Sequence, residues 1–305
     1  MQSIPLGAST LESSRLVYGC MRIVGDNGPA ARQGGKRAVR AALAAGYNHF
    51  DHADIYGRGA CEELFGEVLR ENPGLRDELV LTSKCGIRFK DSPAAGDPKR
   101  FDFSGDYIIE SVQGSLERLG VEHLDVLLLH RPDYLFNAEE VGRSFRMLYD
   151  RGQVRHFGVS NFKPSQVALL QSECPWPLLV NQVEINIHNI DALLDGTLDQ
   201  CQMHDISPMA WCPLGGVAYP AWGNTFNRDD EERIAWELAE QAGKYDVEQW
   251  QIALAWLLKH PAGILPIIGS TTPARIEAAI EALDIDYSRA DWYRLMEARN
   301  GCEVP

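Results

Sequence analysis

Short apolar runs recur along the chain, and each is followed by a turn and then by a longer amphipathic segment. The runs rarely alternate strictly between apolar and polar residues, which is typical of parallel strands that are buried on both faces. We therefore predict eight strands, at residues 16–20, 47–51, 79–84, 126–130, 156–159, 179–184, 207–211 and 265–268.

The segments between these runs have helical periodicity. In residues 33–45, for example, Ala38, Ala42 and Ala45 recur at helical spacing, and Gly46 follows as a typical C-terminal stop. The same pattern predicts helices over residues 61–70, 106–119, 138–151, 164–172, 191–204 and 273–282.

Eight strands that alternate with helices predict an α/β fold, a (β/α)8 TIM barrel, and 305 residues are an ordinary length for one. Residues 229–259 are long enough for two extra helices before the last strand, and residues 288–298 predict one more at the C-terminus. Residues 4–12 predict a small β-hairpin that would cover the bottom of the barrel. Because no linker or low-complexity tract interrupts this pattern, we expect residues 1–305 to form a single domain.

Composition narrows the classes of partner. The net charge of −14 disfavours nucleic acid, because the phosphate backbone would repel such a surface. No apolar run approaches the roughly 18 residues that span a bilayer, and residues 1–10 do not resemble a signal peptide. The seven cysteines are widely spaced and form no Cys-x-x-Cys pair, which favours reduced thiols. We therefore expect a cytoplasmic protein that binds neither membranes nor nucleic acid.

Polar residues end most of the apolar runs. The active site of such a barrel lies at the C-terminal ends of its strands. Asp51, Lys84 and His130 end the second, third and fourth strands, and Tyr56 follows Asp51 by five residues. The later strands end in or near Ser160, Asn161, Gln182, Trp211, Gly269, Ser270 and Thr271.

This set of side chains indicates carbonyl chemistry. A tyrosine has a pKa of about 10, and the Lys84 ammonium would lower the pKa of Tyr56 while Asp51 keeps the lysine charged. His130 could hydrogen-bond a carbonyl oxygen, and Tyr56 could give that oxygen its proton. A hydride-carrying cofactor would supply the missing reductant. Taken singly, each residue also has a structural reading, such as a plain ion pair or a strand-end cap. Their joint placement at successive strand ends favours the catalytic reading.

Five motifs, in order along essentially the whole chain, resemble the aldo-keto reductase superfamily. They are Asp51-His-Ala-Asp-Ile-Tyr56-Gly57, Lys84 at a strand end, Asp125-Val-Leu-Leu-Leu-His130, Gly158-Val-Ser-Asn-Phe162 and Pro266-Ile-Ile-Gly-Ser270. Residues 152–162 are most similar to the bacterial branch of uncharacterised aldo-keto oxidoreductases. The resemblance implies an enzyme that reduces aldehydes or ketones with NADP(H), which it binds without a Rossmann domain. The chain indeed has no Gly-x-Gly-x-x-Gly motif between a strand and a helix.

The resemblance also implies roles for individual residues. The catalytic residues would be Asp51, Tyr56, Lys84 and His130, with Tyr56 as the general acid. Ser160, Asn161 and Gln182 would bind the nicotinamide carboxamide, and Trp211 would stack on the nicotinamide ring. The pyrophosphate would pass the backbone of Pro213, Leu214, Gly215 and Gly216. The adenosine 2′-phosphate would lie against Gly269, Ser270, Thr271 and Arg275. Several branches have lysine at position 269 and asparagine at position 279, where this chain has glycine and alanine, so the expected preference for NADPH is modest.

The substrate is less well defined by the sequence. Rim residues that could line a pocket for a small-molecule carbonyl compound are Met21, Arg22, Phe89, Arg131 and Trp222. The loops at residues 85–105 and 213–229 would set its shape, and loop shape cannot be read from one sequence. The sequence gives no indication of an oligomeric state. Cys85 follows Lys84 and, by strand alternation, should point away from the site.

Two other functions remain open at this stage. His49, Asp51 and His52, with Lys84 and His130, would suit a metal-dependent barrel hydrolase. Such sites need two inward histidines at alternate strand positions and an aspartate at the last strand, and this chain has neither. We therefore expect no metal. The chain could also be a nucleotide-binding regulatory subunit on the same fold, although it has no obvious partner-binding extension. Turnover of simple aldehydes with NADPH distinguishes these alternatives.

Overall fold

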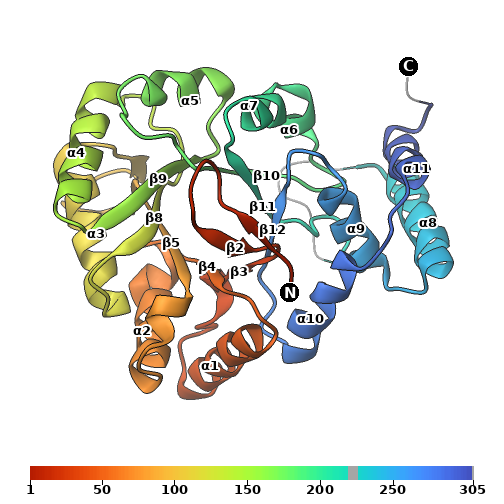
Figure 1. Ribbon diagram of the computed structural model, residues 1–305, viewed down its shortest axis with the longest axis horizontal. Coiled ribbons are helices and arrows are strands. Elements are labelled where there is room, and N and C mark those ends of the chain that lie inside the picture. Colours follow the sequence, from red (N-terminus) through yellow and green to blue (C-terminus); the bar gives the residue numbers. More distant parts are fainter. Residues whose placement is uncertain (219–225, 304–305) are drawn as a thin grey trace.

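Eight parallel strands close into a barrel in the computed structural model, which describes residues 1–218 and 226–303 (Figure 1). Going round the barrel, each strand is hydrogen-bonded to its neighbours, and the circle closes between β12 and β3. The predicted α/β barrel is confirmed, and the strand ends differ from the prediction by only a few residues. The strands are β3 (Val17–Gly19), β4 (His49–Asp51), β5 (Val80–Cys85), β8 (Leu124–Leu129), β9 (Val154–Ser160), β10 (Val180–Glu184), β11 (Ser207–Trp211) and β12 (Leu265–Ile268).

Helices surround the barrel (Figure 1). Their apolar faces pack against the outward-facing side chains of the strands, as the helical periodicity predicts. Cys85 belongs to this outer core, is 1% exposed and points away from the site, as strand alternation predicts. These helices are α1 (Pro29–Ala44), α2 (Ala60–Glu71), α3 (Gly105–Leu119), α4 (Ala138–Asp150), α5 (Pro164–Gln171) and α10 (Pro273–Ala278).

The extra helices lie where the sequence predicts them. Two helices, α8 (Arg228–Tyr245) and α9 (Gln249–Leu258), precede the last strand, and α11 (Arg289–Asn300) follows the barrel. Helices α8 and α11 lie side by side at one edge of the molecule (Figure 1). Across the described part of the chain, none of the helices is long and apolar enough to span a bilayer.

One predicted helix is divided. Residues 191–204 form α6 (Asp191–Leu194) and α7 (Thr197–Met203) rather than a single helix. Gly196, between them, has a φ of 84°, a left-handed conformation that stops an α-helix and that glycine adopts without strain. The Asp195 side chain also accepts a hydrogen bond from the backbone N–H of Thr197 (2.9 Å). The sequence prediction was wrong here because helical periodicity continues through the break.

An N-terminal hairpin covers the end of the barrel at which the parallel strands begin. Strand β1 (Ser3–Pro5) pairs antiparallel with β2 (Glu12–Ser14). Leu6 in the turn is fully buried among inward-facing strand residues such as Val17 and Val126. The backbone N–H of Gly7 donates to the side chain of Ser207 at the start of β11 (2.8 Å). The hairpin therefore closes the bottom of the barrel, as predicted.

A second hairpin follows β5 and was not predicted. It consists of β6 (Ile87–Arg88) and β7 (Arg100–Phe101), which pair antiparallel. Arg88 also forms an ion pair with Asp102 (2.5 Å). Strands of two residues are too short to have a detectable alternation, so the sequence pattern does not reveal them.

Candidate active site

Lys84 and Asp51 form a buried ion pair between β5 and β4. The lysine Nζ lies 2.7 Å from each carboxylate oxygen of Asp51 and 2.8 Å from the backbone carbonyl oxygen of His52. These contacts use the three N–H donors of the ammonium group. Burial lowers the pKa of Lys84, and the charge and hydrogen bonds of Asp51 oppose that effect.

Tyr56 lies above this pair. It begins the short 3₁₀ turn Tyr56–Gly59 after β4. Its ring centroid is 5.0 Å from Lys84 Nζ and 5.9 Å from the centroid of the His130 ring, which it meets edge to face. The four predicted catalytic side chains therefore lie together at one rim of the barrel. Lys84 and His130 are next to the Tyr56 ring, and Asp51 is paired with Lys84.

The pKa of Tyr56 moves in the opposite direction from our expectation. Burial raises the pKa well above its ordinary value, the negative charge of Asp51 raises it further, and Arg131 opposes both. The expectation that Lys84 lowers this pKa was therefore wrong for the net shift, because Asp51 neutralises the lysine and burial penalises the phenolate. The phenol remains protonated at neutral pH.

His130 follows β8 and faces Tyr56. Burial lowers its pKa well below the ordinary value, and the positive charges of Lys84, Arg131 and Lys99 add to this effect. Its ring is therefore neutral, with one nitrogen as donor and the other as acceptor. Nδ1 is buried and has no hydrogen-bond partner among residues 1–218 and 226–303. The ring remains available to an oxygen atom from outside the chain.

The predicted carboxamide-binding residues form a connected chain of hydrogen bonds. Ser160 donates to the backbone carbonyl of Gln182 (2.7 Å), and Asn161 Nδ2 donates to Ser160 Oγ (2.9 Å) and to the carbonyl oxygen of His130 (3.1 Å). Gln182 Nε2 donates to Asp51 Oδ1 (2.7 Å). This last bond joins the cofactor candidates to the catalytic candidates, a connection that sequence reasoning did not find.

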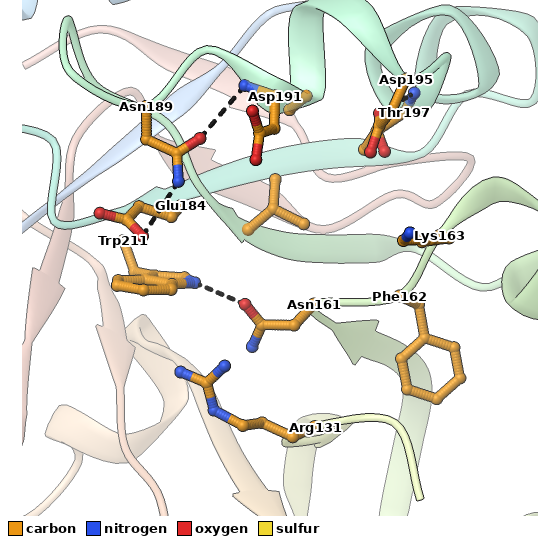
Figure 2. Close-up of a pocket in the computed structure, with 12 residues that line it drawn as sticks. Arg131, Asn161, Phe162, Lys163, Glu184, Asn189, Asp191, Asp195, Thr197 and Trp211 are labelled. Atoms are coloured by element: carbon orange, nitrogen blue, oxygen red, sulfur yellow. Dashed lines mark hydrogen bonds between the residues drawn. The ribbon is translucent and has the colours of Figure 1, made fainter. Parts of the chain in front are cut away.

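Trp211 has a defined orientation at the end of β11. Its indole Nε1 donates to Asn161 Oδ1 (3.0 Å), as Figure 2 shows. The guanidinium carbon of Arg131 lies 5.6 Å from the indole centroid. The hydrogen bond from Trp211 also orients the side-chain amide of Asn161. The amide oxygen accepts from Trp211, and the amide nitrogen donates to the backbone carbonyl oxygen of His130 and to Ser160 Oγ.

The loop of Pro213, Leu214, Gly215 and Gly216 follows Trp211 directly. Gly216 has a φ of 78°, and a Cβ atom there would lie 2.1 Å from the ring of His188. Only glycine fits this position, because the His188 ring fills the space that a side chain would need.

The predicted phosphate site lies at the end of β12. The Tyr18 hydroxyl donates to the carbonyl oxygen of Ser270 (3.0 Å), which anchors this turn to the neighbouring strand β3. Thr271 and Arg275 are exposed. Arg22, which we expected in the substrate pocket, lies here: its Nη1 is 3.9 Å from the position a Cβ of Gly269 would occupy.

The remaining predicted substrate residues are dispersed along the rim. Met21 is exposed, and Phe89 lies under the guanidinium of Arg58 (4.3 Å). Trp222 lies outside the described residues. Arg131 lines a cavity of about 380 Å³ that also includes Asn161 and Trp211 (Figure 2). The other polar residues of this cavity were not predicted from the sequence; they are Lys163, Glu184, Asn189, Asp191, Asp195 and Thr197.

A sequence signal for one of these residues existed. Glu184 ends β10 two positions after Gln182, and residues two apart on a strand point to the same face. Of the other five polar residues, Lys163 comes from the loop before α5 and the rest come from the α6–α7 region. Nothing in their spacing along the chain indicates that they meet.

The histidines that suggested a metal site have other roles. His49 is hydrogen-bonded through both ring nitrogens, to Ser13 and to Thr82 (2.8 Å each). The ring of His52 packs against Phe65, 4.7 Å between centroids. Among the described residues, no three His, Cys, Asp or Glu side chains are grouped so that they could hold a metal ion. The geometry therefore does not support the hydrolase alternative.

Comparisons with known proteins agree with this geometry. Residues 15–300 match the model of the Aldo/keto reductase family. The chain is 42% identical to the oxidoreductase YdhF of Escherichia coli K12 over the full length of both proteins. It is 38% identical to a 6-dehydroglucose reductase of Agrobacterium fabrum, again over the full length of both. A crystal structure of the thermostable aldo-keto reductase Tm1743 superposes with a TM-score of 0.83 at 25% identity, covering 98% of this chain and 100% of the other. The chain therefore belongs to the aldo/keto reductase family of oxidoreductases.

Proposed function

We propose that the protein reduces aldehydes or ketones to alcohols with NADPH, and that Tyr56 is the general acid. The observation that carries this proposal is the packing of a protonated phenol between a neutral His130 and the Lys84–Asp51 pair at one rim. The bound cofactor would supply a hydride to the carbonyl carbon. The residues of this chain then have to position the carbonyl oxygen and give it a proton.

The two rings suit that task. A neutral His130 can donate a hydrogen bond to the carbonyl oxygen, which orients it and stabilises the charge that develops there. Tyr56 transfers its proton to the same oxygen, so that the alkoxide becomes an alcohol and the phenol becomes a phenolate. Lys84, 5.0 Å from the centroid of the phenol ring, stabilises this phenolate. The high pKa of Tyr56 keeps its proton in place until a stronger base, the alkoxide, forms.

Several residues fit a nicotinamide cofactor. Gln182 donates through Nε2 to Asp51, and its Oε1 accepts no hydrogen bond from residues that the structure describes, so it could accept from a carboxamide N–H. The Trp211 indole presents a flat surface in a fixed orientation for the nicotinamide ring. Ser270, Thr271 and Arg275 at the end of β12 would bind the 2′-phosphate, and the 213–216 loop would pass the pyrophosphate. The relative in Agrobacterium fabrum is named a 6-dehydroglucose reductase, which supports a reductase reaction for this chain.

We also propose that residues 1–305 act as one domain in the cytoplasm, on a small-molecule carbonyl substrate. All the proposed catalytic residues come from a single barrel, and none of the proposed roles needs a second chain.

Replacing Tyr56 by Phe tests the proposal. The change removes only the hydroxyl group and should lower turnover of an aldehyde by about 10²–10⁴, the usual loss for a general acid. NADPH oxidation is followed at saturating aldehyde, and binding of NADPH is measured by quenching of tryptophan fluorescence. Binding should barely change, because the phenol does not hold the cofactor.

Tyr134→Phe is the matched control, because Tyr134 lies on a rim loop and is 89% exposed. It should behave as the wild type. Chelators should leave the wild type unaffected. Wild-type turnover in Tyr56→Phe, or activity that depends on a metal, would contradict the proposal. Cofactor binding without turnover of any aldehyde would instead favour a regulatory subunit.

A further inference from the structure

Arg299 connects the C-terminal helix to a loop of the barrel. It lies in the last turn of α11, at one edge of the molecule (Figure 1), and is half-buried. Its Nε donates to the backbone carbonyl oxygen of Ile187 (2.8 Å), and its Nη2 donates to that of His188 (3.3 Å). Both carbonyl groups belong to the segment between β10 and α6. Because these are hydrogen bonds from a charged donor to two consecutive carbonyl groups, they hold the backbone of this segment against α11.

The His188 side chain contacts the loop that we propose for the pyrophosphate. Its ring is fully buried, and a Cβ atom at Gly216 would lie 2.1 Å from it, so the Gly216 backbone packs directly against the imidazole. Nε2 lies 3.1 Å from a carboxylate oxygen of Glu231, in the first turn of α8. The Phe226 ring meets the imidazole edge to face, with 4.6 Å between centroids. The imidazole is therefore a fixed surface against which Gly216 lies.

Asn186, from the same segment, contacts the start of that loop. Its Nδ2 donates to the backbone carbonyl oxygen of Cys212 (3.0 Å). A Cβ atom at Gly215 would lie 2.8 Å from the same nitrogen. Together with His188, Asn186 therefore supports the 213–216 loop at its beginning and at its end.

The guanidinium of Arg299 also contacts Phe226, the ring that packs on His188. Its central carbon lies 5.3 Å from the centroid of the Phe226 ring, a distance at which a cation is attracted to an aromatic ring. Arg299 thus reaches the His188 ring by two routes, through the backbone of His188 and through Phe226. These contacts involve none of the residues that we propose for catalysis.

We propose that Arg299 is a positioning residue for the cofactor: through the segment at residues 185–190, it holds the backbone of residues 213–216 in the conformation that binds the pyrophosphate. This inference rests on the proposed carbonyl reductase function and adds to it a residue of the outer C-terminal helix. The pyrophosphate is common to NADPH and NADH, so loss of Arg299 should weaken both cofactors alike. Chemistry in the loaded enzyme should not change, because the residues around Tyr56 stay in place.

Arg299→Met tests the proposal, because it removes the donors and keeps much of the length of the side chain. We expect the dissociation constants of NADPH and NADH to rise by the same factor, about 3–30-fold, which is the range for a residue that acts through intervening contacts. Quenching of tryptophan fluorescence measures both constants. The rate of aldehyde reduction in a single turnover, started from the enzyme–NADPH complex, should equal that of the wild type.

Two further variants complete the design. Arg294 lies in the same helix, but it forms its ion pair with Asp291 within α11 (2.6 Å). Arg294→Met should therefore bind both cofactors as the wild type does. Arg299→Lys keeps the charge without the fixed fork of donors, so it should weaken both cofactors equally and by less than Arg299→Met. It replaces Arg299→Met in the test if circular dichroism shows that the methionine variant does not fold.

Amide hydrogen exchange of the cofactor-free protein measures the loop directly. The N–H of Gly215 donates to the carbonyl oxygen of Cys212 (3.0 Å), so its exchange reports on the order of the loop. Arg299→Met should speed up exchange in residues 213–217, and Arg294→Met should leave it unchanged.

The outcomes separate this inference from the proposed function. Wild-type affinity for both cofactors in Arg299→Met, or wild-type exchange in residues 213–217, overturns the inference and leaves carbonyl reduction standing. Weakening of NADPH alone, or a slower single turnover, overturns it as well, because Arg299 would then act on the 2′-phosphate or on the chemistry. A wild type that binds neither NADPH nor NADH removes both proposals.

Discussion

Lys84 Nζ lies 2.7 Å from both carboxylate oxygens of Asp51, and the two side chains are almost completely removed from solvent. Asp51→Asn leaves the buried ammonium opposite a neutral amide. Losing one partner of a buried ion pair costs about 3–5 kcal/mol, so we expect the free energy of unfolding to fall by about 3 kcal/mol. Urea denaturation measures this change.

The double variant Asp51→Asn/Lys84→Met serves as the control for this pair, because it no longer buries an uncompensated charge. It should be more stable than Asp51→Asn alone. Equal stability of Asp51→Asn and the wild type would show that the pair contributes nothing to folding.

The pH dependence of reduction follows from the pKa of Tyr56. A general acid must be protonated, and activity is lost as the pH rises through its pKa. Because burial raises the pKa of Tyr56, that loss moves above the ordinary tyrosine value of about 10. His130 has a lowered pKa and stays neutral. We expect kcat/KM for an aldehyde with NADPH to be constant between about pH 7 and pH 9. An alkaline decline centred in that interval, with the fold intact by circular dichroism, would contradict this assignment.

Arg275 tests the choice of cofactor. Arg275 is exposed in α10, four residues after Thr271, and in our proposal it binds the 2′-phosphate that only NADPH carries. A hydrogen bond to a charged group contributes about 1.5–3 kcal/mol. Arg275→Ala should therefore weaken NADPH binding by at least about tenfold and leave NADH binding nearly unchanged. Dissociation constants for both cofactors come from tryptophan fluorescence, with the exposed Arg151→Ala as control. Equal weakening of both cofactors would place the 2′-phosphate elsewhere.

Asp291 joins α8 to α11. It is 1% exposed and accepts hydrogen bonds from Lys244 (2.5 Å), Tyr245 (2.5 Å), Ser288 (2.6 Å) and Arg294 (2.6 Å). Burial alone raises its pKa, but these hydrogen bonds outweigh burial and hold the pKa below its ordinary value. The stability that Asp291 contributes is therefore present above about pH 4 and is lost as the pH falls below that value.

Asp291→Asn should lower the free energy of unfolding at pH 7 by about 3 kcal/mol and reduce its dependence on acid pH. Chemical denaturation at pH 7 and at pH 3 measures both effects. Lys244→Met, which removes a half-exposed partner, should cost much less. An unchanged pH dependence in Asp291→Asn would assign the acid sensitivity to other carboxylates.

The barrel, and the polar residues that meet at the C-terminal ends of its strands, could be predicted from local sequence pattern alone. Asp51, Lys84 and His130 end apolar runs, and in a parallel barrel all such ends meet at one rim, so their convergence follows from local pattern and topology alone. The two helices before β12 and the final helix α11 follow from periodicity in the same way. The break between α6 and α7 was not predicted in this way. Gly196 has a left-handed conformation that stops the helix, and it does so without altering the apolar pattern around it.

The pKa of Tyr56 and the contacts between residues far apart in the chain could be found only from the folded structure. The pKa of Tyr56 depends on burial from all sides and on Asp51 neutralising Lys84, so a sequence argument from one neighbouring cation had the wrong sign. The hydrogen bond from Gln182 to Asp51 and the cavity shared by Arg131 and Glu184 join strands and loops that are far apart in the chain. Burial, charge and hydrogen bonding act over a few ångströms in space, and only folding determines which distant residues come within that range.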